Sequence, residues 1–142
     1  KTPGRTQLIN FFEVNAGRYL VDLPGYGFAK VPLAVKNQWQ RALEKYLRER
    51  EVLSGIVVLS DIRHPMKEFD QQMVEWSVQS DLPVLLLLTK ADKLKRGAAQ
   101  NTLLKVSKAL QDKSQVRVEL FSAQKGTGVD NAREQLSQWL TV

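Results

Sequence analysis

An uninterrupted apolar run, Pro83–Leu88, ends abruptly at the four residues Thr89–Asp92. A run of this length that stops at turn-forming residues is typical of a strand buried on both faces of a parallel sheet. In an open parallel sheet, ligands bind just beyond the carboxyl ends of the strands. The stretch therefore predicts an α/β fold, with Thr89–Asp92 at a position where a ligand binds.

The side chains in this stretch suit a guanine base. The Asp92 carboxylate can accept two hydrogen bonds, one from the ring N–H and one from the exocyclic amino group. Adenine offers neither in this geometry, and sites that require a substrate hydrogen bond can discriminate by roughly 10⁴–10⁵. We expect the stem of Lys90 to lie along the base, with Thr89 and Ala91 completing the loop. The alternative for the motif taken alone is an ordinary polar cap on the next helix.

Strands and helices alternate along the rest of the chain. Alternating or apolar runs predict strands, and apolar residues at helical spacing predict helices. The predicted strands are Leu8–Val14, Arg18–Leu23, Gly55–Ile62, Pro83–Leu88 and Val116–Phe121, the first two joined by a hairpin turn at Asn15–Gly17. Helices are predicted over Pro32–Arg50, around Phe69–Trp76, through Leu103–Leu110 and over Val129–Leu140. This order predicts a mostly parallel α/β sheet with one antiparallel edge.

The composition is that of a single globular domain of 142 residues. No cysteine is present, which excludes disulfides and thiolate metal sites and fits a cytoplasmic protein. No apolar run approaches the ~20 residues of a membrane span. The net charge of +6 suggests a polyanionic partner, RNA more readily than a membrane, although a basic surface without a partner fits equally well.

Further ligand-type residues follow other predicted strands. Asp22 could hold a water of a Mg²⁺ ion, and the Gly25 amide could approach a terminal phosphate. Thr6, in a loop before the hairpin, could ligate Mg²⁺ directly. Ser122 and Ala123 could present a backbone N–H to the guanine carbonyl. Each signal alone also fits a plain turn, but their order along the chain favours a guanine-nucleotide site.

With these motifs the chain resembles the translation-factor-like GTPases, and specifically the bacterial ribosome-assembly family called EngB, YihA or YsxC. The segments that carry the resemblance are Thr2–Gln7, Val21–Gly27, Asp61–Pro65, Thr89–Lys93 and Phe121–Ala123. It implies a three-layer P-loop NTPase fold of the Ras-like GTPase type, mostly parallel with one antiparallel edge strand. It also implies a Mg²⁺-dependent GTPase that binds GTP and GDP, contacts the large ribosomal subunit or its rRNA during assembly, and is linked to cell division and septation.

The resemblance also implies which residues bind the nucleotide. They are Gly4, Arg5, Thr6, Gln7, Leu8, Asp22, Leu23, Pro24, Gly25, Thr89, Lys90, Ala91, Asp92, Ser122, Ala123 and Gln124, with Thr6 and Asp22 as the metal ligands. We expect residues 1–142 to form a single GTP-binding domain, and the protein to be a cytoplasmic monomer that does not associate with membranes.

Two departures from the family pattern shape these expectations. No Gly-x-x-x-x-Gly-Lys-Ser/Thr phosphate loop occurs, and the family places it with a central strand upstream of Lys1. We therefore expect a carboxyl-terminal part of a longer protein, insoluble or molten by itself. Tyr26 stands where Ras-type GTPases orient the attacking water with glutamine, so intrinsic hydrolysis should be slow, and we name no catalytic residue.

The missing motif leaves two function classes open. The first is a GTPase switch that binds a ribosomal subunit. The second is a basic, RNA-docking α/β module that does not bind nucleotide. A response-regulator-like domain is excluded because its acidic cluster at the strand ends is not present.

Overall fold

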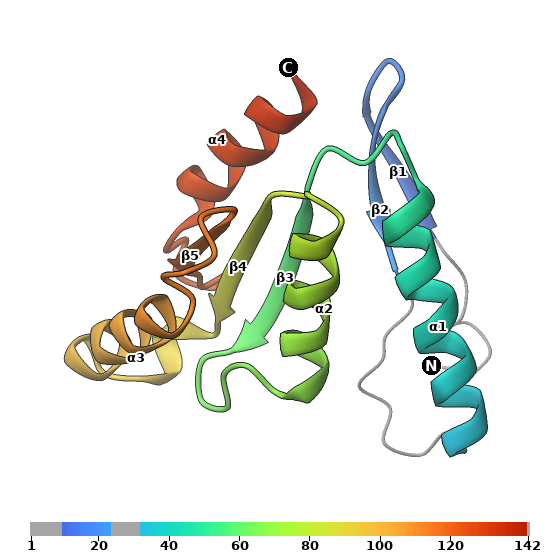
Figure 1. Ribbon diagram of the computed structural model, residues 1–142. Coiled ribbons are helices and arrows are strands. Elements are labelled where there is room, and N and C mark those ends of the chain that lie inside the picture. Colours follow the sequence, from blue (N-terminus) through green and yellow to red (C-terminus); the bar gives the residue numbers. More distant parts are fainter. Residues whose placement is uncertain (1–9, 24–31, 142) are drawn as a thin grey trace. The chain divides into compact units, whose positions relative to one another are not determined.

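The computed structural model in Figure 1 describes residues 10–23 and 32–141. The chain divides into two compact units, the first running to Leu43 and the second from Glu44 to Thr141. Among the described residues, none of the helices combines the length and apolarity that crossing a bilayer requires.

In the first unit, β1 (Asn10–Asn15) and β2 (Arg18–Asp22) form the predicted antiparallel hairpin. The turn between them needs a left-handed residue, and Gly17 supplies it with φ +75°. A bulge between Glu13 and Asn15 shifts the register next to this turn. The pair is a two-stranded sheet of its own within the described residues.

Helix α1 (Leu33–Glu49) follows, within one residue at each end of the predicted range. Leu43 and Leu47 are buried, whereas most other positions along the helix are exposed. The two leucines are four residues apart and so lie on one face of the helix. This is the amphipathic pattern from which the helix was predicted.

The second unit is built on a parallel sheet with the strand order β3-β4-β5. Its strands are β3 (Ile56–Asp61), β4 (Val84–Thr89) and β5 (Val116–Leu120). The helices are α2 (Glu68–Gln79), the short 3₁₀ helix η2 (Ala91–Lys93), α3 (Arg96–Ala109) and α4 (Val129–Leu140). The predicted alternation of strands and helices is confirmed.

Helices cover both faces of β4, which is buried along its length. Leu85 and Leu87 point to one face, where they pack with Ala132 and Trp139 of α4. On the other face, α2 is anchored to β3 by a hydrogen bond from the Ser60 hydroxyl to the Asp70 carboxylate, at 3.0 Å. The three-layer α/β fold, with a parallel sheet and an antiparallel pair, is therefore confirmed.

The strand β3 is buried on one face only. Ile56, Val58 and Ser60 are buried, but Val57 and Leu59 are 37% and 59% exposed. β3 is an edge strand of the three-stranded sheet. Within the described residues, α2 covers one face of β3 and the other face stays open, because α4 packs over the neighbouring strand β4.

Candidate nucleotide-binding site

Three loops meet at the carboxyl edge of the parallel sheet, at the lower end of β3 and β4 in Figure 1. The loop after β3 is tied to β4 because the Ile62 amide donates to the Thr89 carbonyl at 3.0 Å. The loop after β4 is tied to β5 because the Ala91 amide donates to the Phe121 carbonyl at 3.0 Å. The residues predicted to read the base, Thr89–Asp92, thus lie between two other strand ends.

Asp92 and Ser122 meet across this edge. The Ser122 hydroxyl donates to Oδ1 of Asp92 at 2.8 Å. This hydrogen bond is the main reason that the pKa of Asp92 lies below its usual value, because it stabilises the carboxylate. Ser122 is fully buried and Asp92 half-buried, so the carboxylate is held from the protein side and open to a ligand.

Ser122 plays a different part from the predicted one. Its backbone N–H already donates to the Thr127 carbonyl at 2.9 Å, and its hydroxyl oxygen accepts from the Lys125 amide at 3.1 Å. The amide of Ala123 donates no hydrogen bond in the described part of the chain, and Ala123 is exposed. Of the two residues, Ala123 is therefore the available donor for a base carbonyl, while Ser122 orients Asp92.

Lys90 adopts the left-handed conformation with φ 58° and ψ 35°. Its backbone carbonyl accepts from the Lys93 amide at 2.9 Å, and its ammonium lies 3.5 Å from Oδ2 of Asp61. Such a conformation is uncommon for a residue other than glycine and persists where the surroundings hold it. Thr89 fixes the loop through its backbone carbonyl, as described above.

Asp61 and Arg63 belong to the same edge but were not predicted as site residues. The guanidinium of Arg63 donates to both carboxylate oxygens of Asp61, at 3.1 Å to Oδ1 and 2.9 Å to Oδ2. These hydrogen bonds hold the pKa of Asp61 well below its ordinary value. The available signal was the placement of Asp61 at the end of a predicted strand, two residues before an arginine.

A buried polar network supports the loop that carries these residues. The Ser60 hydroxyl accepts from the Met66 amide at 2.8 Å, and Oδ2 of Asp70 accepts from the Lys67 amide at 3.2 Å. Ser60 and Asp70 are themselves hydrogen-bonded, so both ends of the Asp61–Met66 loop are anchored to α2 and β3. Buried polar groups that are satisfied in this way rigidify the structure around them.

Comparison with known proteins identifies the family. The family model described as 50S ribosome-binding GTPase matches residues 1–90. A protein of Idiomarina loihiensis named "Probable GTP-binding protein EngB" is 60% identical over 140 residues, which cover 98% of this chain and 68% of that protein. The EngB protein of Vibrio parahaemolyticus is 58% identical, with 98% of this chain and 64% of that protein covered. The chain belongs to the EngB family of GTP-binding proteins.

The fold comparison agrees with this assignment. A crystal structure described as that of "a probable GTP-binding protein engB" matches with a TM-score of 0.76, at 16% identity, over 95% of this chain and 84% of that one. The elongation factor SelB of Methanococcus maripaludis, in complex with the GTP analogue GppNHp, matches with a TM-score of 0.70, at 16% identity, over 99% of this chain and 30% of that one. At these identities the structures support the fold alone. The chain spans about two thirds of the length of the curated EngB relatives it matches.

Part of the site predicted for this EngB-family chain lies outside the described residues. Those positions are Gly4, Arg5, Thr6, Gln7, Leu8, Pro24 and Gly25. Asp22 is exposed at the end of β2, Leu23 is half-buried, and Gln124 is exposed in the loop after Ser122. The described residues contain no cluster of three His, Cys, Asp or Glu side chains that could hold a metal. Asp22 offers the carboxylate oxygen that Mg²⁺ prefers, and such ions usually keep several waters and add substrate phosphates.

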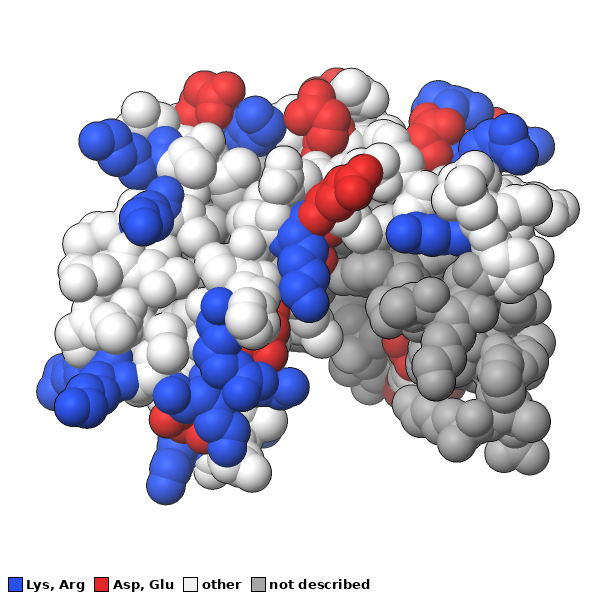
Figure 2. Space-filling model, turned by 90° about the horizontal axis from the view of Figure 1, so that it is seen from below, with Lys and Arg blue, Asp and Glu red and all other residues white. Residues whose placement is uncertain are grey.

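A basic surface surrounds the candidate base site of this EngB-family chain. Figure 2 views the molecule from this end and shows Lys and Arg side chains gathered around a few acidic ones. The basic residues on the three loops and the start of α3 are Arg63, Lys67, Lys90, Lys93, Lys95, Arg96 and Lys125, all exposed. The acidic residues Asp61 and Asp92 stand among them. A polyanion would be attracted to this edge of the sheet.

Proposed function

We propose that the chain is the base-reading part of a GTP switch that binds GTP and GDP with Mg²⁺ and hydrolyses GTP slowly. We further propose that the switch acts in assembly of the large ribosomal subunit and so in cell division and septation, as a cytoplasmic monomer. Membership of a GTP-binding family supports the nucleotide class. The roles in ribosome assembly, cell division and septation are proposed from the resemblance to the family, and the nucleotide contacts from the individual site residues.

The observation that carries the proposal is the ionised Asp92 carboxylate held by the buried Ser122 hydroxyl at 2.8 Å. A carboxylate has about four acceptor positions, and Ser122 occupies one of them. The remaining positions can accept the ring N–H and the amino group of guanine. Because Asp92 is fixed before the base arrives, little ordering is needed on binding.

The phosphate and metal end of the site is proposed from the sequence. Thr6 and Asp22 would hold Mg²⁺, and the Gly25 amide would approach the terminal phosphate. Gly4, Arg5, Gln7, Leu8, Leu23 and Pro24 would line the same end of the nucleotide. Bound Mg²⁺ would neutralise charge on the phosphate oxygens. Tyr26 offers no side chain comparable to the water-orienting glutamine of Ras, which is why we propose slow hydrolysis.

Nucleotide competition in the full-length protein tests this function. A fluorescent GDP analogue should bind in the presence of Mg²⁺, and both GTP and GDP should displace it. ATP should be weaker by a factor of roughly 10³ or more, because adenine leaves Asp92 unpaired. Equal displacement by ATP would contradict guanine reading. Absence of any nucleotide binding would favour the RNA-docking module instead.

The basic surface predicts an electrostatic contact with rRNA. Reversing Lys93 and Lys95 to glutamate should weaken binding to the large subunit while GDP affinity changes little, since neither ammonium is assigned to the base. Wild-type binding should also fall log-linearly with salt, with a slope of about −0.7 to −0.9 per phosphate neutralised. Sedimentation with purified subunits measures both effects.

The matched control reverses Lys105 and Lys108, two exposed lysines near the other end of α3. This variant has the same net charge, but its substitutions lie about 15–20 Å further along the helix at 1.5 Å per residue. It should sediment with subunits like the wild type. A flat salt response, or equal losses in both variants, would remove this surface as the RNA contact.

A further inference from the structure

The carboxylate of Asp61 joins the ends of β3 and β4 by holding two cations. Arg63 donates to it three times, from its backbone amide to Oδ1 at 2.9 Å and from its guanidinium to Oδ1 and Oδ2. The Lys90 ammonium lies 3.5 Å from Oδ2. Oδ1 of Asp61 therefore accepts two hydrogen bonds from Arg63, and Oδ2 accepts one from Arg63 and forms an ion pair with Lys90.

The strand register brings these residues together. In the parallel pairing of β3 with β4, Asp61 is the partner of Thr89, so Lys90 follows directly beside it. Just after this pair, the Ile62 amide donates a hydrogen bond to the Thr89 carbonyl. Lys90 then turns into the left-handed conformation and its ammonium reaches back to Asp61.

Asp92 is the other carboxylate that these cations could pair with. It lies two residues after Lys90, and its charge raises the pKa of Arg63, as a smaller cause than the hydrogen bond and the charge of Asp61. A lysine or arginine paired with Asp92 would occupy acceptor positions that the base needs, because Ser122 already takes one on Oδ1. Base recognition therefore requires that Lys90 and Arg63 be held elsewhere.

We propose that Asp61 is a positioning residue for base recognition, which holds Lys90 and Arg63 away from Asp92 and leaves Asp92 available to guanine. The proposal rests on the guanine-reading function proposed above and adds a residue to it. Asp61 acts through Lys90 and Arg63 and does not itself touch the base. The same contact fixes the Lys90 stem in one orientation beside the site.

Asp61→Asn in the full-length protein tests the proposal. Asparagine keeps a side-chain acceptor for the Arg63 amide but loses the charge that holds the two cations. We expect GDP and GTP affinities to fall together, by about three- to thirtyfold, the range between an exposed ion pair and a hydrogen bond to a charged group. Equal losses are expected because the contact lies at the base end and not at the phosphates.

A double-mutant cycle separates positioning from a role in shaping the turn. Lys90→Met keeps the aliphatic stem but removes the ammonium. If Asp61 acts through that ammonium, Asp61→Asn should cost clearly less in the Lys90→Met background than in the wild type. A loss of the same size in both backgrounds would mean that Asp61 only shapes its loop, and would overturn the proposal.

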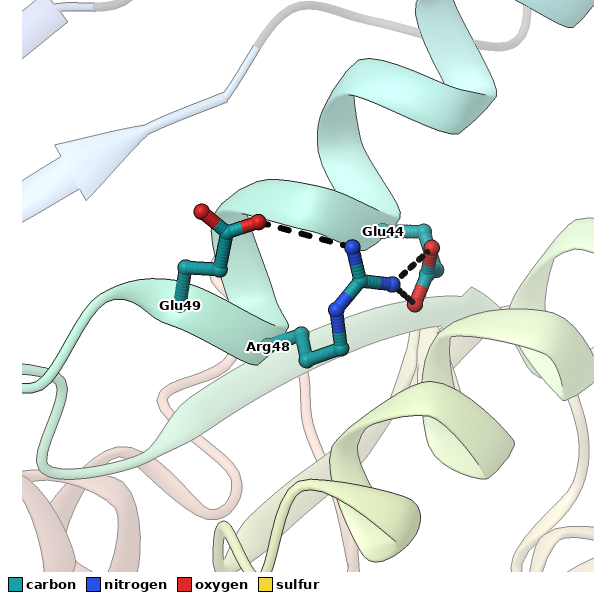
Figure 3. Close-up of polar contacts among 3 residues, drawn as sticks. All are labelled: Glu44, Arg48 and Glu49. Carbon is teal, nitrogen blue, oxygen red and sulfur yellow. Dashed lines mark hydrogen bonds and ion pairs between the residues drawn. The ribbon is translucent and has the colours of Figure 1, made fainter.

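Glu119→Gln is the matched control. Glu119 accepts from the Nε of Arg117 at 2.8 Å, and these partners, like Asp61 and Arg63, are separated by one residue in the sequence. Their side-chain exposures of 38% and 22% resemble the 42% and 23% of Arg63 and Asp61. A second control is Glu44→Gln on α1, which removes the carboxylate whose two oxygens accept hydrogen bonds from the Arg48 guanidinium (Figure 3). Both variants should bind GDP like the wild type.

The outcomes separate this proposal from the function on which it rests. A wild-type protein that does not prefer guanine nucleotides would refute both. If the wild type does prefer guanine nucleotides but Asp61→Asn binds GDP and GTP with unchanged affinity, only the positioning role of Asp61 is refuted. Thermal melting shows whether each variant is folded, and Asp61→Glu, which keeps the charge, should recover most of the lost affinity. If Asp61→Asn fails to fold, a loss in Asp61→Glu as large as that in Asp61→Ala would count against the proposal.

Discussion

Replacing Asp92 by asparagine is expected to move the base preference from guanine to xanthine. Two hydrogen bonds from guanine to a carboxylate are lost, each worth about 1.5–3 kcal/mol, so GDP and GTP affinity should fall by about 10²–10⁴. The asparagine amide can instead donate to the extra carbonyl of xanthine and accept from its ring N–H. Xanthosine diphosphate should therefore bind the variant more tightly than GDP does.

Displacement of a fluorescent nucleotide by GDP and by xanthosine diphosphate measures this change in base preference. Asp112→Asn is the control, because Asp112 is exposed and pairs with Lys113 at 3.4 Å beyond the end of α3. It removes the same charge and should leave both affinities unchanged. If Asp92→Asn keeps the guanine preference intact, the assignment of Asp92 to the base is wrong.

The order of the elements could be predicted because it depends on local patterns. The apolar run Pro83–Leu88 and the spacing of apolar residues in α4 each determine an element by themselves. The exposure of Leu59 could not be predicted in the same way. Leu59 and Leu87 are register partners in adjoining apolar strands, yet α4 covers only the second. Which face of an apolar strand is covered depends on its neighbours in space.

The candidate site likewise combines residues that a local motif predicts with contacts that depend on neighbours in space. Asp92 was predicted because it follows a strand within a short motif. The hydrogen bond that orients it comes from Ser122, 30 residues later, and forms because β4 and β5 are neighbours. Asp61 reaches Lys90 only through the register of β3 with β4. A motif therefore predicts the residue that meets the ligand, whereas its supporting contacts depend on strand order and register.

The loop that presents Ser122 depends on Gly128 at the start of α4. Gly128 has φ +76°, and a Cβ atom there would overlap the backbone carbonyl oxygen of Leu120. The carbonyl of Thr127, the residue before it, accepts the Ser122 amide at 2.9 Å. A side chain at position 128 would therefore push the end of β5 and the start of α4 apart, at the point where Ser122 is held.

Gly128→Ala should destabilise the protein by roughly 2–5 kcal/mol, the sum of about 1–2 for a left-handed alanine and about 1–3 for overpacking. Gly126→Ala isolates the cost of a left-handed alanine, because Gly126 has φ +78° and a Cβ atom there would meet nothing within 4 Å. Urea unfolding of the two full-length variants measures the difference. At temperatures where Gly128→Ala is still folded, its GDP affinity should also be lower, since displacement of Ser122 releases Asp92. Equal stabilities for the two variants would mean that the backbone at Leu120 yields without cost, and that Gly128 does not hold the base-reading loop in place.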